Sequence, residues 1–201
     1  MYSRFAEKVE FLQRHEFDLL ECHRDVDTSP AQPEELPAMV TLARTAVPGV
    51  RVAAATVERV YRQHPQCIFP FRCGGKISGG MAFLYLNEDG FDRLLLDELD
   101  FSDPDPKILT QPGEAPAALY IWALVARGRA AGGIANVNAW LRQEPFSSAD
   151  FYAQPSTQHG ARILVQVGFE PANSFQHNLW TYRRLRNRAA RQPVEAFCCV
   201  A

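Results

Sequence analysis

The sequence predicts a mixed α/β fold in which a mostly antiparallel sheet is flanked by helices. Residues 67–86 hold two β-rich runs around Gly74-Gly75, which is typical of a β-hairpin. Residues 118–153 hold an apolar run, a helical pattern and a short β-rich run, and this order requires a roughly parallel strand pair. One sheet is therefore expected to hold both antiparallel and parallel neighbours.

The first third of the chain is predicted to be helical. Apolar residues at helical spacing indicate a helix within residues 1–16. Residues 17–22 (FDLLEC) could continue this helix or form a first strand, and we expect the strand. A helix follows Pro33 and Pro37 and ends at Pro48-Gly49, and another covers residues 57–64.

The middle of the chain combines the hairpin with an acidic insert. Pro70 indicates that the first hairpin strand lies near a sheet edge or carries a bulge. Residues 87–117 contain four prolines, and eight acidic residues lie between Glu88 and Asp105. A short helix is expected there around Phe91, Leu94 and Leu95.

The last third alternates strands and helices. Residues 118–126 are the most apolar strand candidate, and a helical pattern with one apolar face begins near Gly132. A short strand at 149–153, a helix at 157–168 and a terminal strand pair follow. In the 157–168 helix, Ala161, Leu164 and Val165 are expected to point inward. The arginine-rich end of the chain (positions 183, 184, 186, 188 and 191) is expected to be solvated.

Composition limits the class of protein. The chain has 201 residues, 47% hydrophobic residues and a net charge of −2, which suits one domain and indicates neither nucleic acid nor a membrane as partner. The five cysteines form no paired framework, and no signal peptide is recognisable, so a cytoplasmic location is expected. The spacing of His64, Cys67 and Cys73 does not match a zinc knuckle, and no metal site is predicted.

The stretch ARGRAAGGIANV (126–137) carries the main functional signal. If a helix begins near Gly132, the amides of residues 128–133 lack intrahelical acceptors and can converge on an anion. Arg127 and Arg129 add forked donors suited to phosphate oxygens. On these residues alone, an ordinary strand-to-helix turn with exposed arginines is an equal alternative. A Walker loop would need Lys and Ser or Thr after the glycines, and the chain has Ile134 there.

A dinucleotide site is a weaker alternative. The glycines at 128, 132 and 133 do not follow the G-x-G-x-x-G spacing, although Asp150 lies about twenty residues further on, as such a site requires.

The segment RGRAAGG resembles the pyrophosphate-binding loop of the GNAT (Gcn5-related N-acetyltransferase) superfamily, Arg/Gln-x-x-Gly/Ala-x-Gly/Ala. Arg127, Ala130 and Gly132 match that pattern. The resemblance extends over about residues 17–185, through the order of the elements and Gly168-Phe169 before the next strand. It implies a GNAT fold with a splayed central strand pair. The whole chain, 1–201, would then be one domain with an N-terminal helix (1–16), the insert (87–117) and a tail (186–201).

The resemblance also implies an acyl-CoA-dependent N-acyltransferase. Acetyl-CoA or coenzyme A would be the co-substrate, and a small-molecule or peptide amine would attack the thioester directly. A homodimer is left open. The residues that would bind the cofactor are Trp122, Ala123, Leu124, Arg127, Gly128, Arg129, Ala130, Ala131, Gly132 and Gly133.

The sequence departs from the family pattern at the proton donor. Leu164 stands where the family has a tyrosine, and Tyr152 is our candidate replacement, with Tyr120 as the alternative. The central strand also lacks the glutamate that often serves as base. A weak or inactive module that binds CoA or a protein partner is therefore a second reading. The acidic insert would favour a cationic acceptor if it overhangs the acceptor site, and it is otherwise a solvated loop.

Overall fold

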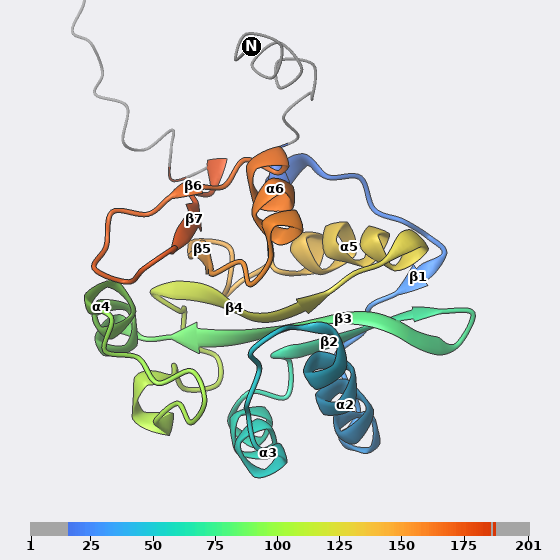
Figure 1. Ribbon diagram of the computed structural model, residues 1–201, viewed down its shortest axis with the longest axis horizontal. Coiled ribbons are helices and arrows are strands. Elements are labelled where there is room, and N and C mark those ends of the chain that lie inside the picture. Colours follow the sequence, from blue (N-terminus) through green and yellow to red (C-terminus); the bar gives the residue numbers. More distant parts are fainter. Residues whose placement is uncertain (1–15, 186, 188–201) are drawn as a thin grey trace, which may run out of the picture.

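An open sheet of seven strands forms the centre of the protein (Figure 1). The computed structural model describes residues 16–185 and 187. The strand order is β1-β2-β3-β4-β5-β7-β6; β4 and β5 are parallel, and the other described neighbours are antiparallel. The predicted mixed sheet is therefore confirmed. The strands are β1 (Val26–Asp27), β2 (Ile68–Cys73), β3 (Lys76–Leu86), β4 (Ala118–Val125), β5 (Asp150–Ala153), β6 (Glu170–Pro171) and β7 (Trp180–Tyr182).

Helices cover both faces of the sheet (Figure 1). On one face lie α2 (Leu36–Ala46) and α3 (Ala54–Gln63), and on the other lie α5 (Gly132–Trp140) and α6 (Gln158–Gln166). The helix α4 (Glu88–Leu96) directly follows β3 inside the acidic insert. These five helices match the predicted ones, because apolar spacing and proline positions are local signals. The described residues also form the short 3-10 helices η1 (Phe17–Leu19), η2 (Pro33–Glu35), η3 (Pro106–Ile108) and η4 (Gly128–Ala131).

The β2–β3 hairpin forms as its glycines predict. Gly74 and Gly75 have φ angles of 58° and 77°, which L-residues with side chains rarely adopt. The expectation for Pro70 is also confirmed. The edge strand β1 pairs with β2 only at Arg72 and Cys73, so Pro70 lies outside that pairing, and a register shift follows between Phe71 and Arg72.

The strand expected at residues 17–22 is wrong. Phe17–Leu19 forms the 3-10 helix η1, and the edge strand β1 lies further along the chain. The Phe17 ring meets Phe151, Phe169 and Tyr182 edge to face, at centroid distances of 5.0, 5.6 and 5.5 Å. Tertiary contacts of this ring, rather than local strand preference, therefore set the backbone here. The helix predicted within 1–16 lies outside the described residues, apart from its last position.

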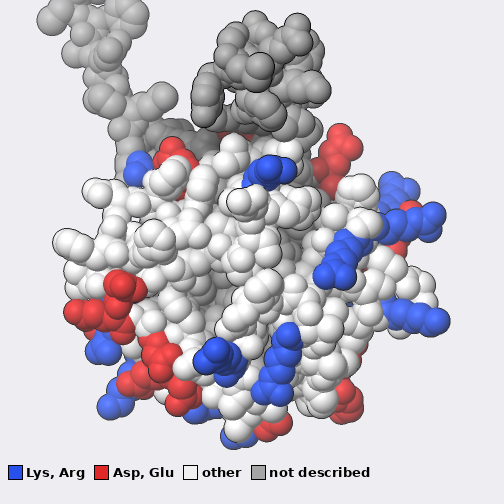
Figure 2. All heavy atoms as spheres, in the orientation of Figure 1, with Lys and Arg blue, Asp and Glu red and all other residues white. Residues whose placement is uncertain are grey.

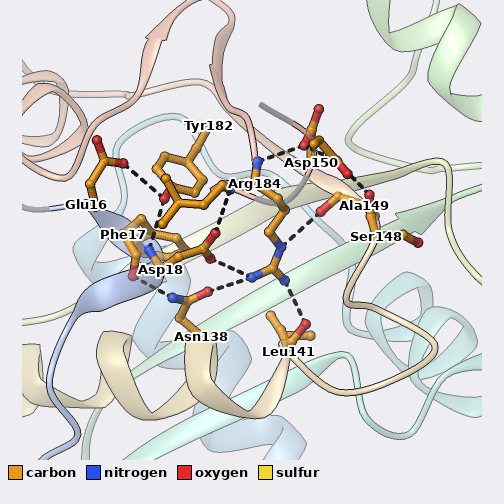
Figure 3. Close-up of polar contacts among 12 residues, drawn as sticks. Glu16, Phe17, Asp18, Asn138, Leu141, Ser148, Ala149, Asp150, Tyr182 and Arg184 are labelled. Carbon is orange, nitrogen blue, oxygen red and sulfur yellow. Dashed lines mark hydrogen bonds and ion pairs between the residues drawn. The ribbon is translucent and has the colours of Figure 1, made fainter. Parts of the chain in front are cut away.

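The expectation of a solvated arginine-rich end is wrong for Arg184, which is 2% exposed. Its guanidinium donates to Asp18 Oδ1 at 2.8 Å, Asn138 Oδ1 at 3.2 Å and the Leu141 carbonyl at 2.7 Å (Figure 3). The guanidinium also lies 4.4 Å from the centre of the Phe151 ring. Positions 186, 188 and 191 of that end lie outside the described residues.

Helix α6 contacts the core more narrowly than expected. Leu164 is buried, at 7% exposure, but Val165 is 37% exposed, so its predicted inward position is wrong. Successive residues of an α-helix lie about 100° apart around its axis. Val165 is therefore turned away from the side of α6 that Leu164 packs against the core.

Candidate functional site

The parallel pair β4–β5 separates halfway along β4. The pairing runs from Ala118–Asp150 to Ile121–Ala153 and ends there. Beyond that point, β4 continues to Val125 and keeps its pairing with β3 alone. The expected splay is therefore present, and it leaves one backbone edge of residues 122–125 without a neighbouring strand among the described residues. Trp122, Ala123 and Leu124, which were predicted to bind the cofactor arm, lie on this edge.

A bulge lies at the start of the splay. Ala82 of β3 faces Ala123, but Phe83 faces Ile121, so Trp122 is the extra residue on β4. Such a bulge bends its strand and interrupts pairing. The indole of Trp122 donates from Nε1 to the Phe101 carbonyl of the insert at 2.9 Å. The sequence offered no local signal for this bulge, because residues 118–125 contain neither glycine nor proline.

The basic turn after β4 lies next to the splay. Arg127, Gly128 and Arg129 are exposed, and Gly128 has a φ of 54° with open space where a Cβ would be. Within residues 16–185, the guanidinium groups of Arg127 and Arg129 form neither an ion pair nor a hydrogen bond. Their charges are therefore available to an anion that approaches the turn.

The predicted cradle of six free amides is wrong in part. Residues 128–131 form the 3-10 helix η4, in which the amide of Ala130 donates to Arg127, and the amide of Gly132 donates to Ala130 and Arg129. The amides of Gly128 and Arg129, at the start of this helix, donate to no backbone carbonyl of the described residues. The tight 3-10 turn uses carbonyls three residues back, which the sequence argument did not anticipate.

Close packing explains the other small residues of the turn. A Cβ on Gly132 would lie 2.6 Å from the His23 ring, and one on Gly133 would lie 2.5 Å from the Phe71 ring. Ala130 is buried, whereas Ala131 is exposed. Gly132 and Gly133 therefore allow the turn to pack against its neighbours, and the outer surface of the turn is formed by residues 127–129 and 131.

Gly79 of β3 is a site residue that the sequence argument missed. A Cβ there would lie 2.5 Å from the Val125 carbonyl and 3.2 Å from the Ala130 Cβ. The absence of a side chain therefore lets the end of β4 and the turn lie directly on β3. The Gly79-Gly80 pair inside a β-rich run was the available signal, since strand glycines often mark close approach of another backbone.

The two candidate proton donors lie side by side on the paired half of the sheet. Tyr120 of β4 and Tyr152 of β5 are register partners, so their side chains lie on the same face. The Tyr120 hydroxyl donates to Gln154 Oε1 at 3.0 Å, and burial raises the pKa of Tyr120 well above its usual value, so this phenol keeps its proton at neutral pH. The Tyr152 ring packs 5.1 Å from that of Phe91 in α4.

The acidic insert packs closely against the sheet near these tyrosines. The Phe101 ring stacks on Tyr120 at a centroid distance of 4.5 Å. Asp103 pairs with Arg59 and accepts a hydrogen bond from Thr56, both on α3. The hydrogen bond from the Arg59 guanidinium, and next the one from the Thr56 hydroxyl, lower the pKa of the Asp103 carboxyl. The insert is thus attached to both β4 and α3, although most of its carboxylates remain exposed.

A hollow opens on the face drawn in Figure 2, between α6 and the central strands. Lys and Arg side chains gather toward the end of this face where the turn after β4 lies, and Asp and Glu gather over α4. Basic side chains thus predominate toward one end of this face and acidic side chains gather over α4, although charges of both signs occur at each end.

Comparison with known proteins gives similarities in structure. Neither a protein-family model nor a curated protein matches the sequence. The loading GNATL domain of CurA from Lyngbya majuscula superposes with a TM-score of 0.58 at 13% identity, over 79% of this chain and 97% of that domain. The GphF GNAT-like decarboxylase, solved in complex with isobutyryl-CoA, gives a TM-score of 0.46 at 20% identity. The superposition covers 65% of this chain, and this chain spans 65% of the length of the decarboxylase. An N-acetyltransferase from Staphylococcus aureus Mu50 gives 0.40 at 17% identity, over 77% and 97% of the two chains.

Within the described residues, no helix has both the length and the apolar character needed to cross a bilayer.

Proposed function

From the GNAT fold that this chain has, we propose that it binds an acyl-CoA and transfers the acyl group to an amine. The observation that supports this proposal is the free edge of β4 beyond Ile121, next to an exposed basic turn. The pantetheine arm would add to Trp122, Ala123 and Leu124 like an extra strand, since its amides can pair with an unpaired strand edge. This use of the edge requires no rearrangement of the described sheet.

The diphosphate would lie at the outer surface of the turn. The amides of Gly128 and Arg129 and the guanidinium groups of Arg127 and Arg129 are the donors available there. Ala131 lines the same surface, whereas Ala130, Gly132 and Gly133 support the turn from within. Charge-assisted bonds of this kind are the strong ones, so the arginines are expected to supply much of the affinity.

The proposed chemistry is direct attack on the thioester. The amine nitrogen forms a bond to the carbonyl carbon, the C–S bond breaks, and the amine loses a proton to water or a base. A β4 amide on the free edge would stabilise the developing oxyanion. The leaving thiolate would take a proton from Tyr152, and Tyr120 is the alternative donor.

Binding is tested by measuring the affinity of the full chain for CoA by calorimetry. The Arg127→Ala/Arg129→Ala double variant should bind CoA at least tenfold more weakly, because hydrogen bonds to charged groups contribute about 1.5–3 kcal/mol each. Arg62→Ala is the control, since this α3 side chain is 76% exposed and lies on the other face of the sheet. Equal CoA affinity in the double variant would contradict the placement of the diphosphate.

A catalytically weak or inactive CoA-binding module is the second candidate. The observation that favours it is Leu164, a buried apolar residue at the position of the family's tyrosine acid. Amine-dependent release of free thiol from acetyl-CoA or butyryl-CoA separates the two candidates, because a binding module releases none. Comparison of Tyr152→Phe with Tyr120→Phe then identifies the donor, whose loss should lower the rate by about 10²–10⁴-fold.

A further inference from the structure

An apolar pocket lies against the face of the splayed part of β4. It is bounded by α2, by the segment that joins α2 to α3, and by β3 and β4. Its volume is about 60 Å³, severalfold more than the ~10–15 Å³ that one water needs. The residues that line it are Met39, Val40, Leu42, Ala43, Arg44, Val50, Val52, Val57, Ile68, Gly80, Met81, Ala82, Trp122, Ala123 and Val125.

The lining carries almost no polar group. Arg44 is its one charged residue, and the Arg44 guanidinium donates to the Val52 carbonyl at 2.7 Å, which attaches the connecting segment to α2. A polar or charged group placed in this pocket would lose its hydration without gaining a partner, which is unfavourable. An aliphatic chain meets no such penalty.

The pocket is continuous with the proposed cofactor site. Trp122 and Ala123 belong both to its wall and to the free edge of β4, and Val125 extends the same wall toward the basic turn. The edge of a strand carries its backbone groups, and its faces carry the side chains. A thioester held at the edge therefore has the apolar pocket directly over the adjacent face.

We propose that this pocket receives the acyl chain, so that the preferred co-substrate is an acyl-CoA with an aliphatic chain of several carbons rather than acetyl-CoA. This inference rests on the proposed function. The alternative occupant is an apolar part of the acceptor. An acceptor held in this pocket must still bring its polar nucleophile to the thioester. Among the described side chains of the lining, none could orient that nucleophile or remove its proton, so the acyl chain is the better occupant.

The test measures the affinity of the full chain for CoA, acetyl-CoA, butyryl-CoA and hexanoyl-CoA by calorimetry. Affinity should rise roughly tenfold or more from acetyl to butyryl, since each buried methylene contributes about fourfold. The Ala43→Leu variant fills the pocket from α2 and should remove this dependence on chain length. Ala38→Leu makes the same change at an exposed position of α2 and should keep it. Val50→Phe, in the connecting segment, fills the pocket from another side if Ala43→Leu does not fold.

Each outcome supports or overturns the inference. A rise with chain length that both filling variants abolish supports it. Tight CoA binding with equal affinity for all acyl lengths overturns the inference and leaves the proposed function intact. Absence of binding to CoA and to every acyl-CoA overturns the proposed function and the inference with it. Filling variants that keep the chain-length dependence, but lose turnover with apolar amines, would assign the pocket to the acceptor.

Discussion

At the scale of single residues, His64 shows how burial changes a titratable group. The side chain is buried at the end of α3, where Nε2 lies 2.5 Å from the Thr110 carbonyl, and its ring meets Tyr85 edge to face. Desolvation is the largest cause of its shift and lowers the pKa of His64, while the contact with Thr110 acts in the opposite direction. Its surroundings are those of a core histidine whose ring nitrogen donates to a backbone carbonyl.

We expect His64 to make the protein less stable in mild acid. Because the folded pKa lies below the ordinary value of 6.5, the unfolded chain binds more protons than the folded chain below that pH. This contribution to the free energy of unfolding is complete above about pH 6.5 and is lost as the pH falls toward the folded pKa, at up to roughly 1 kcal/mol per pH unit. Urea titrations from pH 7.5 to 5 measure the slope, and His64→Gln should flatten it. An equal slope in the variant would contradict the assignment.

At the scale of elements, β4 combines three features that act together. Its first half pairs on both sides, the bulge at Trp122 interrupts the ladder, and its second half leaves one edge free. The strand then enters η4 at Gly128, whose positive φ allows the sharp change of direction. The position of this second half depends on β3, because Gly79 lets the backbone of β4 at Val125 approach β3 closely.

Gly79→Ala should disturb this arrangement specifically. The added Cβ would contact backbone at Val125, which cannot move aside as a flexible side chain would. We expect a loss of about 1–3 kcal/mol in the free energy of unfolding, as for other overpacked sites, together with weaker CoA binding because the turn shifts. Ser78→Ala, at the exposed neighbouring position, should change neither quantity appreciably. Urea unfolding and calorimetry check both, and wild-type values for Gly79→Ala would show that the contact is relaxed in solution.

At the scale of the whole molecule, one buried ion pair joins segments from both ends of the described chain. Asp18 of η1 accepts from Arg184, which follows β7, and the same guanidinium holds Asn138 and Leu141 at the end of α5 (Figure 3). Asp18 also accepts from the amide of Leu185. Nε of Arg184 donates to the Ala149 carbonyl at 3.3 Å. Each of the three guanidinium nitrogens therefore has at least one acceptor, which is how a charge that desolvation disfavours is kept in the interior.

Removal of this arginine should be costly. Arg184→Ala leaves the Asp18 carboxylate buried without its counter-charge, and we expect a loss of about 3–5 kcal/mol in urea unfolding. Arg183→Ala, at the adjacent position, removes an arginine that is half exposed and should change stability by about 0.5 kcal/mol or less. Asp18→Asn should recover part of the loss in the Arg184→Ala background, because it removes the uncompensated charge. Simple additivity of the two costs would contradict this account.

Much of the fold was predictable because its signals are local. Apolar spacing and prolines located α2, α3, α5 and α6, and Gly74-Gly75 located the hairpin. The strand–helix–strand order over 118–153 was enough to require the parallel pair. From the residues themselves the site was predictable only as far as the exposed basic turn, since Arg127 and Arg129 are recognisable by residue type alone. The free edge at Trp122, Ala123 and Leu124 was expected only from the resemblance to the GNAT superfamily.

Contacts between distant segments decided the rest. The 3-10 form of Phe17–Leu19, the burial of Arg184, the bulge at Trp122 and the apolar pocket each depend on partners far along the chain. Periodicity along a segment determines whether it can be a helix or a strand and which of its faces is apolar. It does not determine which other segment covers that face, and in this protein that covering sets both the free edge of β4 and the cavity beside it.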